Sequence, residues 1–229
     1  LINFHFYQNK NMKSKVTVLT TVYNGMPYLK EAIKSTLNQT FSNFEYLIID
    51  DASTDKEVLK CIKSFKDPRI KFLQNNINLG VSETLNKALN VITTPYVVRL
   101  DQDDISLPNR LEEQINYLEK HPDISIVSSW EHMIDDSGKK TFDFKSNVKN
   151  YGDFLAPVLL GLCPIFHPSI AFKKDIIFEI GGFNSQYSLA EDLDLTTKLA
   201  LNRYAAAIVP RFHLLVRVHQ NSQSRKFIE

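Results

Sequence analysis

Glycine and cysteine are scarce in this sequence, and their scarcity excludes several kinds of site. Cys61 and Cys163 lie about a hundred positions apart. Neither belongs to a CxxC or Cys/His pattern, so we expect reduced thiols and no structural zinc site or disulfide framework. Only seven glycines occur, and TVYNG at 21–25 carries a single one. A glycine-rich phosphate loop is therefore not expected, which argues against dehydrogenases and P-loop nucleotidases.

An excess of charge of one sign is also missing. Lys and Arg number 27 against 26 Asp and Glu, a formal net charge of +1, with no block of like charges. Nucleic acid is therefore not an expected partner, because binding it requires a strongly basic face. The longest nearly continuous apolar run, at 154–166, has 13 residues and contains two prolines. Crossing a bilayer takes about 20 apolar residues, so we expect no membrane-spanning helix.

The beginning of the chain carries no recognisable targeting signal. Residues 1–15 lack both the sustained apolar stretch and the small-residue cleavage site of a secretory signal peptide, so a cytoplasmic location is expected. Because Met12 precedes the first periodic segment, we interpret residues 1–14 as a leader or extension. The remainder, 15–229, has the length and composition of one globular domain.

An alternation of strand and helix patterns fills residues 15–130. Short β-branched and aliphatic runs predict strands, and apolar residues at helical spacing predict helices between them. The strands are expected at 16–21, 44–50, 70–73, 96–100 and 124–129, and the helices at 56–65, 81–92 and 108–121, with another opened by Pro27. This order predicts an α/β fold with a mostly parallel, Rossmann-like sheet and helices on both faces.

The pattern changes after about residue 131. Asp135 to Gly138 predicts a hairpin turn, and 145–166 shows no clear period. Beyond it we expect a strand at 169–172, helices at 174–180 and 191–202, and two late strands at 204–210 and 212–219. We interpret 131–229 as an irregular second half of the same domain, because no linker or repeat separates it from 15–130.

Polar clusters follow three of the predicted strands, at 21–24, 50–51 and 101–104. Ligands bind at the carboxyl ends of strands in an open parallel sheet, so these clusters should converge on one edge. Five carboxylates gathered there would raise one another's pKa values unless a positive charge lies among them. A divalent cation such as Mg²⁺ or Mn²⁺ meets this need best. Taken singly, each aspartate is better explained as a helix cap or turn acceptor.

Seven segments carry a resemblance to a known family: TVYNG at 21–25, IIDDASTD at 48–55, NLGVSETLN at 78–86, RLDQDDISLPNRLEEQ at 99–114, HPSIAFKKD at 167–175, GGF at 181–183 and AEDLDL at 190–195. In sequence, order and spacing they resemble the family 2 glycosyltransferases, especially bacterial members that build surface polysaccharides. The resemblance implies a GT-A fold, a nucleotide-diphosphate-sugar donor, preferably a UDP-sugar, and Mn²⁺ or Mg²⁺. It further implies inverting transfer to a hydroxyl of a glycan or lipid-linked acceptor. The donor would then lie in 15–130 and the acceptor in 131–229.

The resemblance also assigns roles to residues of the first half. It implies that Thr21 and Tyr23 hold the nucleotide base and that Asp51 hydrogen-bonds a uracil-type edge. Asp101 and Asp103 match a DXD pair, in which Asp103 is the direct metal ligand. Further contacts to the nucleotide sugar are expected from Asn24, Asn78 and Gln102.

The second half supplies the expected catalytic residues. Asp192 matches the catalytic base, and Glu191 beside it is expected near the acceptor. His219 resembles a late histidine that helps bind the metal or diphosphate, with Arg217 nearby, and His167 is expected on the acceptor side. The simpler alternative for the acidic doublet is a favourable charge at a helix N-terminus, and a lone histidine is often a core or surface residue.

Two other functions remain open. A sugar nucleotidyltransferase usually has a glycine- and arginine-rich loop after its first strand, which TVYNG is not. A nucleotide-sugar-binding module without turnover would need the pocket but not Asp192. The apolar run 154–166 is expected either as core or as an exposed strip that meets a lipid-linked acceptor at the inner face of the membrane.

Overall fold

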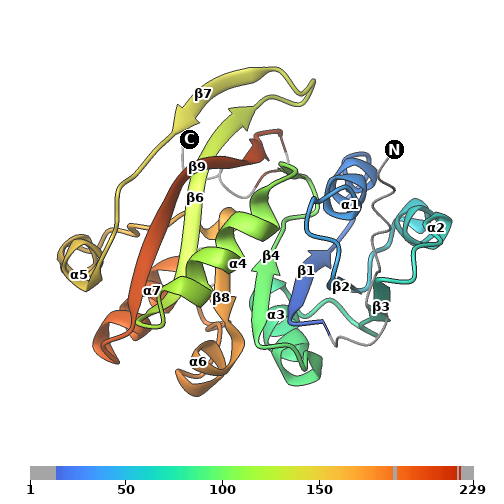
Figure 1. The fold of residues 1–229 in the computed structure, drawn as a ribbon. Coiled ribbons are helices and arrows are strands. Elements are labelled where there is room, and N and C mark those ends of the chain that lie inside the picture. The colour runs from blue at the N-terminus through green and yellow to red at the C-terminus, as the bar shows by residue number, and fades with distance from the viewer. Residues whose placement is uncertain (1–13, 188–189, 221, 223–229) are drawn as a thin grey trace, which may run out of the picture.

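The computed structural model of the chain describes residues 14–187, 190–220 and 222. They form a nine-stranded sheet with helices on both faces (Figure 1). Its order is β3-β2-β1-β4-β8-β6-β9-β5, and β7 pairs with β6. The predicted extension lies outside the described residues except for Ser14. None of the helices in the described part of the chain is long and apolar enough to cross a membrane.

The first half follows the predicted alternation. Its elements are β1 (Val16–Val22), α1 (Leu29–Leu37), β2 (Phe44–Asp50), α2 (Lys56–Ser64), β3 (Ile70–Gln74), α3 (Val81–Val91), β4 (Tyr96–Arg99), β5 (Ile105–Ser106), α4 (Arg110–Lys120) and β6 (Ile124–Ile134). Every predicted strand and helix of this half is present, with ends that differ by a few residues except at β6. The two-residue β5 was not predicted, because so short a strand has no periodicity.

The second half contains β7 (Lys140–Phe144), α5 (Tyr151–Leu159), a 3₁₀ turn (His167–Ser169), β8 (Ala171–Lys173), α6 (Lys174–Glu179), α7 (Glu191–Leu201) and β9 (Ala205–Arg217). β8 lies antiparallel between β4 and β6, and β9 runs parallel to β6. Strands β1 to β4, β6 and β9 thus share one direction, while β5, β7 and β8 oppose it. The predicted α/β class with a mostly parallel sheet is confirmed.

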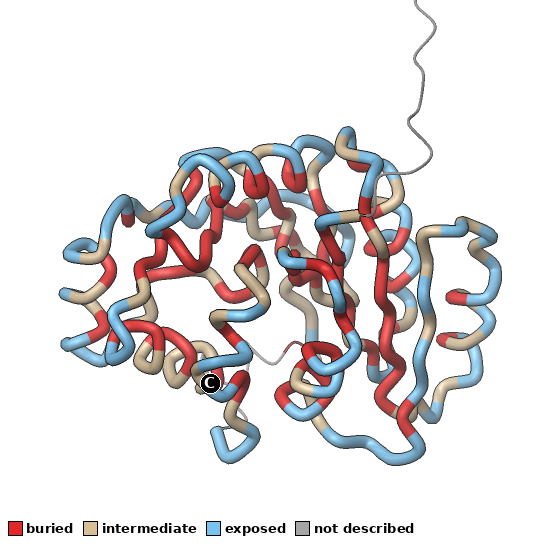
Figure 2. The backbone as a smooth tube through the Cα atoms, turned by 60° about the horizontal axis from the view of Figure 1, so that its bottom comes forward, coloured by how far each residue is buried: buried red, intermediate tan, exposed pale blue. Residues whose placement is uncertain are grey.

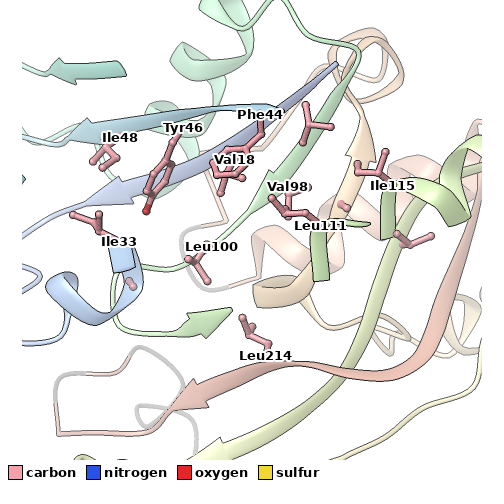
Figure 3. Close-up of a cluster of buried hydrophobic side chains, with 14 of the residues drawn as sticks. Val18, Ile33, Phe44, Tyr46, Ile48, Val98, Leu100, Leu111, Ile115 and Leu214 are labelled. Carbon is pink, nitrogen blue, oxygen red and sulfur yellow. The ribbon is translucent and has the colours of Figure 1, made fainter. Parts of the chain in front are cut away.

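Apolar residues cover both faces of the sheet, which explains why β1, β2 and β4 lack polar alternation. Alternate residues of these strands pack under α1, α2 and α4 in one cluster (Figure 3), which includes Val18, Ile33, Tyr46, Ile48, Val98, Leu111 and Ile115. Their neighbours face the opposite side with α3, α5 and α7, in a cluster that includes Leu19, Leu47, Ile49, Leu85, Val97, Phe154 and Leu199. Figure 2 shows these central strands buried beneath exposed outer surfaces.

The prediction of two late strands in the second half was wrong. The two late strands are one strand, β9, which passes Pro210 by a shift of register between the pairs Ser129–Val209 and Trp130–Phe212. A proline without an N–H fits only at such an irregularity, so it marked a bulge and not a strand end. β6 continues beyond the predicted 124–129 to Ile134, and β7 completes the predicted hairpin.

The segment without a clear period contains α5. Asn150 caps this helix, since its side chain accepts a hydrogen bond from the N–H of Asp153. Pro157 lies inside the helix and concealed it from sequence reasoning. The apolar run 154–166 is partly core and partly exposed. Phe154 is fully buried, whereas Leu159 and Leu160 are 75% and 77% exposed.

Candidate active site

A cleft of about 1100 Å³ opens at the carboxyl ends of β1, β2 and β4. The register of the sheet places it there, because Val22 at the end of β1 pairs with Asp50 at the end of β2. The cleft is lined by every residue predicted for the donor, the metal and catalysis: Thr21, Tyr23, Asn24, Asp51, Asn78, Asp101, Gln102, Asp103, Glu191, Asp192 and His219. The structure therefore brings the two halves of the predicted site together, while the role of each residue stays a prediction.

The loop after β1 is fastened to the loops after β2 and β4. The Gln102 amide accepts from the N–H of Tyr23 at 2.8 Å and donates to its carbonyl at 3.2 Å. The Asn24 Oδ1 accepts from the N–H groups of Thr54 and Asp55, both at 3.0 Å. Gln102 and Asn24 thus use these atoms to hold the walls of the cleft. The Tyr23 side chain, in contrast, is exposed at the cleft.

Asp51 is buried at the end of β2, and its carboxylate accepts three hydrogen bonds. Oδ1 accepts from Asn75 Nδ2 at 2.7 Å and from the N–H of Leu79 at 2.9 Å. Oδ2 accepts from the N–H of Gly80 at 2.8 Å, and Asn78 Oδ1 accepts from the same N–H at 3.1 Å. Asp51 therefore holds the turn before α3, a role that sequence reasoning missed. Oδ2, with one protein donor, retains a lone pair for a ligand.

Three arginines lie among the carboxylates, and the sequence analysis had not singled out two of them. Arg99 Nη2 is 2.6 Å from Asp101 Oδ1. Arg110 is fully buried and donates to the carbonyl of Arg99 at 2.6 Å. Arg217 Nη2 is 2.6 Å from Glu31 Oε2. The protein thus supplies part of the positive charge that the sequence analysis had attributed to a metal. The sequence did contain a signal for them, because Arg99 and Arg110 lie on either side of the acidic segment 101–104.

Burial dominates the electrostatics of the acidic cluster. It raises the pKa of Asp104 well above its usual value, and the charges of Asp103 and Asp101 add to the rise. Burial also raises the pKa of Asp101, against the opposing charge of Arg99. Burial lowers the pKa of Arg110 to about 10, so its guanidinium stays charged at neutral pH. Repulsion between carboxylates is present as expected, but it is secondary to their removal from water.

Asp103 and His219 are in contact in the lining of the cleft, where Asp103 Oδ2 lies 2.9 Å from His219 Nε2. Within the described residues, no group of three or more His, Cys, Asp or Glu side chains is arranged to hold a metal ion. A complete protein cage is therefore not built here. A carboxylate and an imidazole beside Asp101 do fit a Mn²⁺ or Mg²⁺ ion that takes its other ligands from water and a substrate diphosphate.

The acidic doublet begins α7 and lines the same cleft. Glu191 is buried, and burial raises its pKa. Asp192 is half-buried, and its Oδ1 accepts from the N–H of Leu193 at 2.7 Å. The N-cap position belongs to Ala190. Asp192 is therefore not the cap of α7, although its charge lies in the first turn.

Two further side chains of the second half lie at or near the cleft. His167 is buried, and its pKa lies well below the usual value, first because of burial and then because of the Arg99 charge. It is therefore a neutral imidazole in the lining of the cleft, and its place on the acceptor side stays a prediction. Burial raises the pKa of the Cys163 thiol to about 12, and the Asp192 carboxylate adds to this rise. Cys163 stays protonated, as expected for a reduced thiol, but its place beside Asp192 was not predicted.

Comparison with known proteins gives results of two kinds. The model of the family described as "Glycosyl transferase family 2" matches residues 17–180. The O-antigen biosynthesis glycosyltransferase WbnJ of Escherichia coli is 32% identical over 190 residues, which cover 80% of this chain and 71% of WbnJ.

The other similarities are to solved structures. One is residues 1–349 of TarS from S. aureus in complex with UDP-GlcNAc, with a TM-score of 0.73, 20% identity, and coverage of 92% of this chain and 60% of that one. Another is the mannosyltransferase PcManGT of Pyrobaculum calidifontis with GDP-Man and Mn²⁺, with a TM-score of 0.70, 23% identity, and coverage of 95% and 61%. At these identities the likeness shows the GT-A fold alone.

Proposed function

The chain belongs to the family 2 glycosyltransferases, and we propose that it is an inverting enzyme that moves a sugar from a nucleotide-diphosphate sugar to an acceptor hydroxyl. One observation carries the proposal: Asp103, His219 and Tyr23 line a single cleft together with Asp192. A donor site and a base are both needed for transfer, and they come from the two halves of the chain. The relationship to WbnJ supports a place in the synthesis of surface polysaccharide.

The proposed chemistry follows from these positions. Asp103 and His219, with Asp101 beside them, would hold Mn²⁺ or Mg²⁺, which supplies positive charge to the departing diphosphate. Asp192 accepts the proton of the acceptor hydroxyl as its oxygen bonds to the anomeric carbon and the bond from that carbon to the diphosphate breaks. Attack from the face opposite the leaving group inverts the anomeric centre. The products are the glycosylated acceptor, a nucleoside diphosphate and a protonated Asp192.

Membership of the family removes the sugar nucleotidyltransferase alternative and leaves the binding module without turnover. Asp192→Asn separates the two functions. Asn keeps the size of Asp but accepts no proton, so nucleotide-sugar binding should persist while transfer falls about 10²-fold or more. Calorimetry measures the binding, and release of the nucleoside diphosphate measures the turnover.

Asp194→Asn is the matched control. Asp194 lies in the same turn of α7 but pairs with Lys198 at 2.8 Å, away from the cleft lining. Its substitution should leave transfer nearly unchanged. Normal transfer by a folded Asp192→Asn protein would contradict the assignment of the base, and Glu191 would be the next residue to test.

The metal and the base of the donor are tested separately. UDP binding should need Mn²⁺ or Mg²⁺ and should collapse in Asp103→Ala, because that carboxylate is a proposed metal ligand. UDP should also bind ahead of ADP, since Asp51 Oδ2 can accept the ring N–H of uracil at its edge, whereas adenine has no ring N–H there. The neighbours TarS and PcManGT are in complex with UDP-GlcNAc and GDP-Man respectively, so the fold accommodates either base. Equal affinity for ADP and UDP would contradict the role of Asp51.

The proposed acceptor is a glycan or a lipid-linked glycan at the inner face of the cell membrane. Leu159, Leu160 and Leu162 are exposed at the end of α5, just before the segment that leads to His167 at the cleft. Such leucines would contact a lipid surface. Leu160→Ser should lower sedimentation with vesicles of anionic lipid, whereas Val91→Ser, an exposed change on α3, should not. Equal sedimentation of both variants and the wild type would contradict membrane contact through these leucines.

A further inference from the structure

Arg217 ends β9, and its guanidinium connects three other parts of the chain. Its side chain is only 2% exposed, and Nη2 lies 2.6 Å from Glu31 Oε2 on α1. Nε donates to the carbonyl of Asp103 at 3.2 Å. Nη1 donates to the carbonyls of Asp135 and Asp136 in the β6–β7 turn, each at 3.2 Å. One side chain thus joins α1, this turn and the loop that carries the predicted metal ligand.

The same residue also fixes the segment that carries His219. The carbonyl of Arg217 accepts from Ser222 Oγ at 3.2 Å, and Ser222 Oγ accepts from the N–H of His219 at 2.9 Å. The Tyr28 ring lies 4.5 Å from the Arg217 guanidinium carbon and 4.9 Å from the His219 ring. The N–H of Arg217 donates to Asp104 Oδ1 at 2.9 Å. Arg217 therefore contacts the surroundings of both Asp103 and His219.

A direct role at the diphosphate is the obvious alternative, because arginine forks suit phosphate. The contacts argue against it. The guanidinium already donates to one carboxylate and three carbonyls, and almost none of its surface is free. A phosphate would have to displace these bonds. The interaction with substrate is thus left to Asp103 and His219, whose facing atoms are 2.9 Å apart.

We propose that Arg217 is a positioning residue that aligns Asp103 and His219 for the metal-bound diphosphate. The inference rests on the proposed function. The two ligands lie 116 positions apart in the sequence, so their alignment depends on contacts between distant segments. Groups that orient metal ligands typically change metal affinity or activity by about 10–100-fold when they are removed.

Substitution of Arg217 by lysine separates the effect of the guanidinium hydrogen bonds from the effect of the positive charge. Arg217→Lys keeps a cation opposite Glu31 but cannot serve three carbonyls in fixed directions. Arg211→Lys is the matched control, because Arg211 is an exposed arginine on the same strand. Calorimetry should measure UDP affinity with Mn²⁺ and with chelator for each protein, alongside the melting temperature. We expect Arg217→Lys to weaken UDP binding in Mn²⁺ about 10-fold or more. The weak residual binding in chelator should be unchanged, and Arg211→Lys should behave like the wild type.

Each outcome decides the inference. Wild-type Mn²⁺-dependent affinity in a folded Arg217→Lys protein overturns it. An equal loss with and without metal overturns it too, because that result indicates direct contact with the nucleotide. If Arg217→Lys does not fold, Glu31→Gln tests the inference instead. The Glu31 side chain is 57% exposed, so the fold should tolerate the change. We expect a several-fold loss of UDP affinity in Mn²⁺ and no loss in chelator. Unchanged affinity of that variant rejects the inference. If metal does not improve UDP binding by the wild type, the metal proposal fails and this inference fails with it.

Discussion

The buried carboxyl of Glu131 should make the stability of the protein depend on pH. It lies on β6, is 5% exposed, and its Oε1 has no hydrogen-bond partner. Burial raises the pKa of Glu131 from 4.5 to about 7, although Ser169 and the Arg110 charge oppose the rise. At neutral pH the folded protein therefore holds this proton about half of the time, whereas the unfolded chain has lost it.

The size and sign of the effect follow from this shift. One unit of pKa corresponds to about 1.4 kcal/mol, so a rise of 2.5 units (7 − 4.5) amounts to about 3 kcal/mol. The folded pKa is raised, so the stabilisation is fully present below about pH 4.5 and is lost as the pH rises through about 7. Glu131→Gln removes this titration while keeping the shape of the side chain. Relative to the variant, the wild type should lose about 2 to 3 kcal/mol between pH 5 and pH 8.

Urea unfolding of both proteins at these two pH values measures the difference. The comparison subtracts the pH dependence of every other group, because only one carboxyl differs. Glu112→Gln on the exposed side of α4 is the matched control, since it removes one carboxyl without removing a buried one. A difference between wild type and Glu131→Gln that does not change with pH would refute the reasoning.

Three other substitutions probe the cleft and the core. Asp51→Ala leaves three hydrogen-bond donors without their acceptor, so the free energy of unfolding should fall by about 3 kcal/mol or more in urea titration. Thr21→Ser is the control, and a loss smaller than that of the control would contradict this expectation. Gly25→Ala places its Cβ 2.6 Å from Gln102 Oε1, so the Gln102 amide must move. UDP affinity, measured by calorimetry, should then drop several-fold. Wild-type affinity would show that the hydrogen bonds between Gln102 and Tyr23 are dispensable for UDP binding. Phe154→Ala empties a fully buried site and should cost about 3 to 5 kcal/mol, whereas a Tm within a degree of the wild type would mean that α5 adds little to the core.

The sequence by itself determined the fold class and the edge at which the site lies. Alternating apolar runs predict strands and helices because their periods differ, and parallel strands place their carboxyl ends together. The acidic residues after β2 and β4 could therefore be assigned to one cleft with the loop after β1. Where periodicity was broken, as at Pro157 in α5 and Pro210 in β9, the prediction failed.

Only the tertiary structure decided how the charges and hydrogen bonds of the cleft are arranged. Arg217 and Glu31 are 186 positions apart, and Gln102 and Tyr23 are 79 apart, so no local pattern reveals that they meet. The burial of Glu131 depends likewise on packing around β6. Desolvation and charge compensation depend on distances in space, and these are set by the way the sheet brings separate strands together.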